Sequence, residues 1–210
     1  MGRAKARERQ MTDSHDFSDE TRAIQKRFQT DRLADKMLER VFRTSFTDAD
    51  REFIENAMLF FLATVDADGR PQCSHKGGPR GFVRVTGPSE LVFPCYEGNG
   101  LYLSMGNVAS TGGVGLLFID FEKQTRLRVN GEAVIDDAHP LLDEVSAAQL
   151  AVRVTVTDIH PNCPRNIHKM NFAELSKYTP KGDTENVGKA PWGARFDDVL
   201  PDYMKPDEGE

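Results

Sequence analysis

The chain has 210 residues, of which 39% are hydrophobic and 29% charged, and its formal net charge is −6. A chain of this length forms one ordinary globular domain with extensions at its ends, and it needs neither disulfides nor a structural metal to fold. Collagen-like, fully disordered and miniature folds are excluded. The excess of acid gives little non-specific attraction to nucleic acid or anionic lipid, so neither is an expected partner.

The longest apolar run, residues 57–65, is about half of the roughly 20 residues that a transmembrane helix needs. The basic segment 1–10 is not followed by the apolar stretch of a secretory signal. Three widely spaced cysteines, Cys73, Cys95 and Cys163, do not form a disulfide framework and fit a reducing compartment. These features predict a cytoplasmic protein.

The N-terminal third is polar and then helical in character. Residues 1–16 are poor in hydrophobic side chains, which predicts a disordered or tethered arm. Residues 17–57 are predicted to be a helical extension that packs on the following domain. Apolar residues recur there at helical spacing with a break at Thr30-Asp31, and Thr47 before two aspartates predicts the N-cap of a further helix.

Residues 58–176 have the texture of a mainly β domain. Seven apolar or alternating runs, each bounded by Gly, Pro, Asp or Asn, predict strands over residues 60–65, 72–76, 82–85, 90–94, 114–121, 126–136 and 151–159. The turn residues at 66–71 predict that the first two strands form a hairpin. Short connections favour a sandwich or closed barrel over a parallel sheet. A short helix is expected after Arg165, and residues 177–210 form a C-terminal extension with an acidic tail.

Two of these strands predict how their faces are used. Residues 126–135 alternate, with Leu127 and Val129 on an apolar face and Arg126, Arg128 on a polar face that can hold a ligand. Residues 114–119 are apolar on both faces and therefore need cover on both sides. The second cover is a helix or another subunit, and we favour a homodimer.

Two segments combine polar side chains with glycines. The segment Ser74-His75-Lys76-Gly77-Gly78 places a hydroxyl, an imidazole and an ammonium beside backbone that a flat ligand or a phosphate can approach, although it equally fits a polar strand that runs into a turn. In residues 96–107, a helix that begins near Asn99 or Gly100 would offer free N–H groups to an anion beside Ser104, and Asn99 as an ordinary helix cap is the simpler reading. The second segment lacks the third glycine and the βαβ context of a dinucleotide fingerprint.

Other chemistries find little support. His160, Cys163 and His168 supply three ligands without a paired Cys-x2-Cys, so no metal site is expected. Hydrolase and nucleotide triphosphatase motifs do not occur.

The order of these motifs resembles that of the pyridoxamine 5′-phosphate oxidase-like flavin-nucleotide-binding family. The resemblance covers about residues 30–175, and the segment 162–167 is similar to a subgroup of predicted flavin-binding proteins. It rests on the hairpin 61–71, the two glycine-containing segments, and the strands that contain Val114-Gly115-Leu116-Leu117-Phe118 and Arg126-Leu127-Arg128-Val129-Asn130-Gly131.

That resemblance implies a homodimeric split β-barrel with flanking helices and with two FMN sites at the subunit interface. The residues it assigns to FMN are Ser74, His75, Lys76, Gly77, Gly78, Asn99, Ser104, Asn107, Arg126, Arg128 and, from the partner subunit, Arg165. It also implies a flavin-dependent oxidoreductase that acts on a small molecule, with no catalytic acid or base identified.

The chain departs from the family at two places. Leu101 stands where many relatives have an arginine that contacts the phosphate, and the C-terminal Arg-x-His motif that reads the substrate phosphate in true pyridoxamine phosphate oxidases does not occur; Trp192-Gly193-Ala194-Arg195 lies in this region instead. We therefore do not expect this chain to oxidise vitamin B6 as the true pyridoxamine phosphate oxidases do. The alternatives are a non-catalytic module that binds or senses flavin, heme or deazaflavin, and a barrel whose ligand site has decayed.

Overall fold

The computed structural model describes residues 17–145, 147–180, 195–196 and 198–205. The chain divides into two compact units, with the boundary in the sequence after Phe42. The arm predicted over residues 1–16 and the end of the acidic tail lie outside the described residues. None of the helices in the described part is long and apolar enough to pass through a bilayer.

The first unit contains the two helices that the break at Thr30-Asp31 predicts. Helix α1 spans Asp19–Arg27 and α2 spans Asp31–Arg40, and Arg22 Nη1 of α1 lies 2.6 Å from Asp35 Oδ1 of α2. Neither helix contains a buried residue. Their packing on the β domain stays a prediction.

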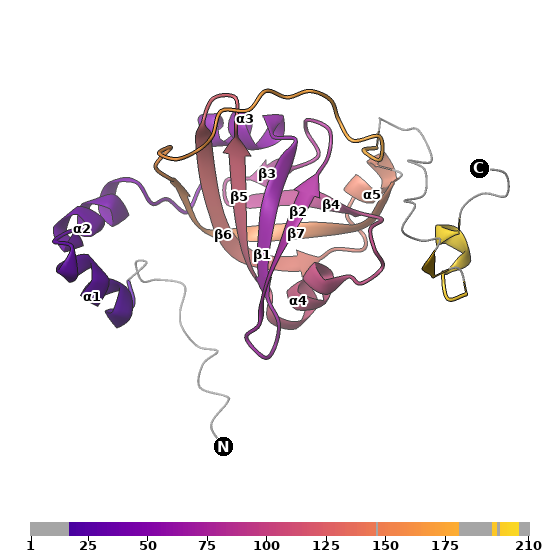
Figure 1. Ribbon diagram of the computed structural model, residues 1–210, viewed down its shortest axis with the longest axis horizontal. Helices are drawn as coiled ribbons and strands as arrows, with labels where there is room; N and C mark the ends of the chain where they lie inside the picture. The colour runs from indigo at the N-terminus through magenta and orange to yellow at the C-terminus, as the bar shows by residue number, and fades with distance from the viewer. Residues whose placement is uncertain (1–16, 146, 181–194, 197, 206–210) are drawn as a thin grey trace, which may run out of the picture. The chain divides into compact units, whose positions relative to one another are not determined.

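The second unit is built on one antiparallel sheet. Its strands are β1 (Leu59–Val65), β2 (Pro71–Gly77), β3 (Arg84–Gly87), β4 (Glu90–Tyr96), β5 (Gly113–Asp120), β6 (Thr125–Ile135) and β7 (Ala148–Pro161). The order in the sheet is β2-β1-β5-β6-β7-β4-β3. All seven predicted strands are therefore present, and the predicted hairpin of β1 and β2 is confirmed. The sheet curls round so that β2 and β4 come near each other, as Figure 1 shows.

The β1–β2 turn fixes the register of this hairpin. Asp66 Oδ1 accepts hydrogen bonds from the backbone N–H groups of Asp68 and Arg70, each at 2.9 Å, and Gly69 has a φ of +84° that glycine adopts without strain. The register places Ser74 opposite Leu62 and Lys76 opposite Phe60.

One face of the curled sheet encloses the core, which includes Phe60, Leu62, Leu116, Phe118 and Val129. Strand β6 alternates as predicted, and its buried residues are Leu127, Val129, Gly131 and Ala133. Helix α3 (Asp48–Asn56) lies at one end of the barrel and α4 (Leu103–Thr111) lies at the other (Figure 1). Their side chains Ile54, Met105 and Val108 complete the core.

The opposite face of the sheet, which we call the outer face, is only partly covered in one chain. Cross-strand pairing aligns His75, Phe61, Leu117 and Arg128 in one row of this face. Phe61 and Leu117 are half-buried, whereas His75 and Arg128 are exposed. In the next row of this face, Gly115 pairs with Asn130. A Cβ atom at Gly115 would lie 3.2 Å from the Asn130 Oδ1 atom, so this second row is closely packed.

The structure differs from the expected local conformation at three places. The described residues 166–180 contain no helix, because backbone groups of this segment bond outward: Met170 N donates to Phe121 O at 3.2 Å, and Ile167 O accepts from Gln124 Nε2 at 2.7 Å. Helix α4 begins at Leu103 rather than near Asn99. A short helix, α5 (Leu141–Glu144), was not predicted.

Candidate functional site

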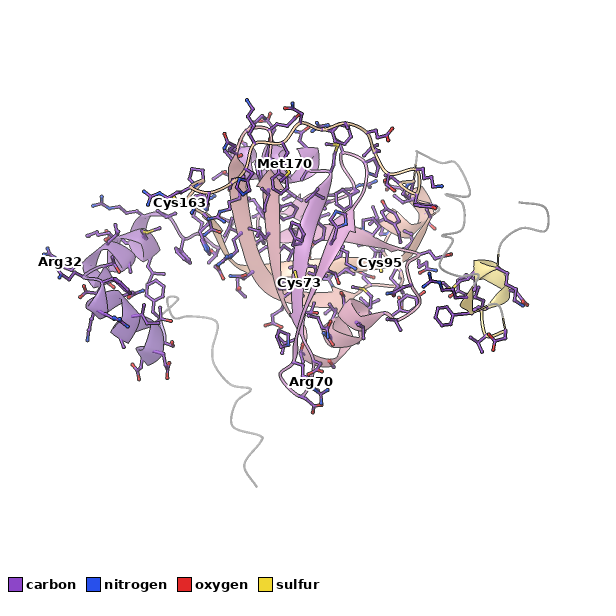
Figure 2. The ribbon with its side chains drawn as sticks, viewed as in Figure 1. Arg32, Arg70, Cys73, Cys95, Cys163 and Met170 are labelled. Carbon is purple, nitrogen blue, oxygen red and sulfur yellow. The ribbon has the colours of Figure 1, made fainter. Side chains whose placement is uncertain are left out.

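A small cavity lies at the seam between β2 and β4, beside the start of α4. Its volume is about 140 Å³, and we call it the seam cavity. The lining residues come from β2, from β4 and the loop that follows it, and from α4: Ser74, Lys76, Cys95, Tyr96, Gly98, Asn99, Gly100, Tyr102, Leu103, Ser104 and Met105. Figure 2 marks the two strands of the seam by Cys73 on β2 and Cys95 on β4.

Strand alternation decides which residues of β2 enter the seam cavity. Ser74 and Lys76 share the face that includes their β1 partners Leu62 and Phe60, whereas His75 points to the outer face. There the His75 ring lies edge-on to the Phe61 ring, with 6.0 Å between the ring centroids. One strand therefore supplies alternate side chains to two different surfaces.

A pair of hydroxyl groups joins β2 to the first turn of α4. Ser74 Oγ and Ser104 Oγ are 2.8 Å apart, and Ser104 is only 5% exposed. Within the described part of the chain, no side chain caps the N-terminus of α4. Because the first N–H groups of a helix have no partner within it and its dipole is positive there, this end of α4 attracts an anion.

Among the described residues that line the seam cavity, one side chain is cationic and none is a carboxylate. The Lys76 ammonium is the cation. Burial raises the pKa of the Cys95 thiol, although Lys76 opposes this shift. Burial also raises the pKa of Tyr96 to about 12, and it raises the pKa of Tyr102 together with a hydrogen bond to Tyr203. These three groups are therefore protonated and neutral near pH 7.

The loop before α4 has two residues in the left-handed region. Gly100 has a φ of +73°, and Tyr102, the N-cap residue, has a φ of +48° that is unusual for a side chain of its size. Asn99 Oδ1 accepts from Leu101 N at 3.1 Å, so Asn99 stabilises the loop and does not cap the helix. The Tyr102 hydroxyl donates to Gln149 Oε1 at 2.8 Å.

Other residues that the sequence assigned to FMN lie away from the seam cavity in one chain. Asn107 is buried and donates to Thr64 Oγ1 at 3.0 Å, so it ties α4 to β1. Packing explains the two glycines at the end of β2, of which Gly77 is its last residue and Gly78 follows it. A Cβ atom at Gly77 would lie 2.9 Å from the His75 ring, and one at Gly78 would lie 2.5 Å from the Phe82 ring.

The three arginines predicted to bind phosphate also lie outside the seam cavity. Arg126 and Arg128 are on the outer face of β6, and Arg165 is exposed in the segment after β7. The Arg126 Nε atom is buried and makes no hydrogen bond within the described residues. The structure therefore brings together Ser74, Lys76, Asn99 and Ser104, and it separates the arginines from them.

Sequence analysis missed Cys95, Tyr96 and Tyr102 as lining residues. Tyr96 and Tyr102 flank the glycine-containing loop, which was a local signal. Cys95 gave no such signal, because its position depends on the closure of the sheet between β2 and β4.

A larger cavity of about 680 Å³ lies at the α3 end of the barrel. Its apolar lining comes from α3, from the ends of β1 and β5, and from the segment that carries Met170 in Figure 2: Phe53, Met58, Leu59, Ile119, Phe121, Met170 and Phe172. Glu52, Arg80 and Lys123 are among its charged lining residues. Met58 O accepts from Gly78 N at 3.0 Å, so this cavity begins where β2 ends.

Comparisons with solved structures give matches of low sequence identity. HupZ of Group A Streptococcus has 19% identity and a TM-score of 0.47, and the match covers 60% of this chain and 99% of HupZ. HutZ, the heme storage protein of Vibrio cholerae, has 18% identity and a TM-score of 0.37 over 53% of this chain and 87% of HutZ. An F420 reductase has 20% identity and a TM-score of 0.35 over 56% and 97% of the two chains.

No curated protein matches the sequence. The family model for pyridoxamine 5′-phosphate oxidase matches residues 46–176. This range includes all seven described strands, α3, α4 and the residues that line the seam cavity, and it leaves out the C-terminal extension. The barrel with a seam between β2 and β4 is the mainly β split barrel that the sequence predicted. The chain therefore belongs to the pyridoxamine 5′-phosphate oxidase family.

Proposed function

We propose that this protein binds FMN, with the phosphate in the seam cavity, and acts as a flavin-dependent oxidoreductase on a small molecule. One observation carries the proposal: the Ser74 and Ser104 hydroxyls, the Lys76 ammonium and the uncapped N-terminus of α4 converge on one cavity. Hydroxyls, an ammonium and helix N–H groups are the donors that phosphate sites use.

The electrostatics of the cavity fit a phosphate. A phosphate monoester carries about two negative charges near neutral pH. Lys76 and the positive end of the α4 dipole offset this charge, and the neutral Cys95 and Tyr96 add no repulsion. When bound, the isoalloxazine would supply the hydride or electron chemistry, while the chain binds and orients it. No catalytic acid or base needs to be assigned in this cavity.

The cavity is too small for a complete flavin. Its 140 Å³ are well below the roughly 300–1,000 Å³ of ordinary cofactor sites. The ring must therefore extend beyond the phosphate, and we propose that a second copy of the chain supplies the remaining wall. The half-buried Phe61 and Leu117 on the outer face, together with Val65 at 42% exposure, are apolar surface that a homodimer would cover.

This homodimer would give the remaining candidate residues a role. In one chain Arg126, Arg128 and His75 point to the outer face, and Arg165 is exposed. We propose that these residues, with the Gly77-Gly78 backbone, reach the flavin from the partner or line its ring. The buried Arg126 Nε atom has no partner among the described residues, which fits a donor that acquires its acceptor on assembly or on ligand binding.

The larger cavity is the candidate substrate site. It adjoins the end of β2 through the bond between Gly78 N and Met58 O, and it is lined by phenylalanine and methionine side chains. Its volume suits a small molecule, and its lining combines these apolar side chains with the charged residues Glu52, Arg80 and Lys123. Vitamin B6 phosphate is not proposed, because the chain lacks the Arg-x-His motif that reads the substrate phosphate.

The proposal is tested by titrating the purified apoprotein with FMN, riboflavin, FAD and F420 while flavin fluorescence and sedimentation are recorded. Saturation with one FMN per subunit, a dimer at micromolar concentration and much weaker binding of riboflavin, which lacks the phosphate, are expected. Equal affinity for FMN and riboflavin would contradict the phosphate assignment. A monomer with full FMN affinity would contradict the shared site.

The alternative is a non-catalytic module that binds or senses flavin, heme or deazaflavin. The missing Arg-x-His motif, which reads the substrate phosphate in true pyridoxamine phosphate oxidases, motivates it. Tight FMN binding with no reduction by nicotinamide donors or thiols would support this module, whereas rapid turnover with one donor would rule it out. In either case we propose a cytoplasmic location, in keeping with the three unpaired cysteines.

A further inference from the structure

The C-terminal extension contacts the loop that forms one wall of the seam cavity. Residues 198–205, here called the C-terminal turn, lie beyond the family match and contain a short 3₁₀ helix, η2 (Asp202–Met204). Its Leu200 and Met204 are 9% and 7% exposed, whereas Val199 is 72% exposed. The turn therefore has two apolar anchors and one side that faces solvent.

One anchor packs directly on the loop before α4. The Met204 Cε and Sδ atoms lie 3.8 and 3.9 Å from the position of a Cβ atom on Gly100, which is ordinary van der Waals contact. Tyr203 hydrogen-bonds with Tyr102. Gly100 and Tyr102 both line the seam cavity, so this loop lies between the cavity and the C-terminal turn.

The loop has a conformation that needs such support. The left-handed region is unfavourable for a residue that carries a side chain, and Tyr102 has a φ of +48° at the N-cap of α4. Strained residues persist when surrounding contacts hold them. Here the Tyr102 hydroxyl bond to Gln149, the contact with Tyr203 and the packing of Met204 on Gly100 hold the loop from outside the cavity.

We propose that the C-terminal turn is a clamp that holds the loop 97–102 in its phosphate-binding conformation. Tyr203 and Met204 are positioning residues, because they touch the loop and not the cavity. This inference rests on the proposed FMN site. Since coupling between two sites is reciprocal, phosphate binding and docking of the C-terminal turn stabilise each other.

The test compares FMN binding and hydrogen exchange in the full chain and in variants of the turn. A chain that ends after Val199 is expected to bind FMN about tenfold more weakly, within the usual range of such coupling. A chain that ends after Lys205 and the Val199→Ala variant, whose side chain faces solvent, are the controls and are expected to keep full affinity. Met204→Ala and Tyr203→Phe, which retain the chain length, are expected to show part of the loss.

Hydrogen exchange separates the failure of the clamp from the failure of the proposed function. Amides of the loop 97–102 should exchange faster in the truncated chain even without FMN, and FMN should slow exchange at Leu200 and Met204 in the full chain. Unchanged affinity and unchanged loop exchange after truncation would overturn the clamp. If the full chain binds no FMN but truncation still loosens the loop, the contact is correct and the FMN assignment is wrong.

Discussion

The two helices that close the ends of the barrel, α3 and α4, differ in how their N-termini are capped. At α3, Thr47 Oγ1 accepts from Asp50 N at 3.2 Å, while Asp50 Oδ2 accepts from Thr47 N at 2.8 Å and the carboxylate also receives the Arg43 guanidinium. At α4, Tyr102 occupies the N-cap without a side-chain cap. Both helices contribute to one core, but only the N-terminus of α4 is left without a cap from its own sequence.

This difference separates a structural helix from a binding helix. A capped N-terminus satisfies its own N–H groups and has little to offer a ligand, whereas an uncapped one retains its donors and its positive potential. The cap of α3 can also be predicted from its sequence. Whether the N-terminus of α4 binds a ligand depends instead on the residues of other elements that fold next to it.

The largest expected effect comes from removing the cap of α3. Asp50→Ala loses the capping box and leaves Arg43 without its carboxylate, so the free energy of unfolding should fall by about 3 kcal/mol in urea titrations. Asp48→Ala, an exposed change in the same turn, is the control and should cost well under half as much. Equal losses in both variants would show that the cap contributes little.

The same carboxyl predicts an acid dependence. Burial raises the pKa of Asp50, but hydrogen bonds from Arg43 and Thr47 outweigh burial and hold that pKa below its usual range. The stabilisation is therefore present above the ordinary pKa of about 4 and is lost as pH falls through the lowered value. The difference in unfolding free energy between wild type and Asp50→Ala should shrink over that acid range.

At the α4 end, Lys76→Ala should weaken FMN binding by about thirtyfold, roughly 2 kcal/mol, and should reduce the salt dependence of binding. Fluorescence titration at two salt concentrations measures both. Cys73→Ser, on the same strand but on the outer face, should retain the affinity. A Lys76→Ala protein that binds FMN normally would place the phosphate elsewhere.

Alkaline pH provides a third comparison. Because the folded-state pKa of Tyr96 is raised from 10 to about 12, its stabilisation is complete below pH 10 and is lost as pH rises through about 12. After allowance for its partial exposure we expect a loss of about 1 kcal/mol. Tyr96→Phe should unfold with a flatter profile in this range. If the unfolding free energies of wild type and Tyr96→Phe fell in parallel with rising pH, the raised pKa of Tyr96 would be contradicted.

The smallest effect is expected from the hydroxyl pair. Ser104→Ala should weaken FMN binding about threefold to fivefold, because one neutral hydrogen bond is lost. Ser74→Ala should act similarly, and the double variant should lose less than the two single effects combined, since the hydroxyls are 2.8 Å apart. Strict additivity would indicate that the pair does not act on one ligand group.

Local pattern was enough for much of the fold. Alternation along residues 126–135 correctly separated Leu127 and Val129 from Arg126 and Arg128, because each side chain's face follows from its position in the strand. The predicted helix after Arg165 was wrong, since apolar spacing does not reveal that Met170 N finds its acceptor in another segment, at Phe121 O.

The candidate site was less predictable for the same physical reason. Ser74, Lys76 and Ser104 could be selected as polar residues beside glycines. The contact of Ser74 with Ser104 and the approach of Lys76 to Cys95 depend on the closure of the barrel, which joins residues about 20 to 30 positions apart. His75 was grouped with Lys76 by adjacency, although adjacent residues of a strand face opposite sides.

The length of the β1–β2 turn determines which side chains of β2 face the seam cavity and which face outward. Because Asp66 fixes the length of the turn, deleting one residue between Asp66 and Arg70 would shift β2 by one position against β1. His75 and Cys73 would then enter the seam, and Lys76 would move to the outer face. Deletion of one residue in a turn away from the cavity would thus replace the ammonium of the anion site by an imidazole and a thiol. Turn length is therefore a way to change the ligand preference of this barrel.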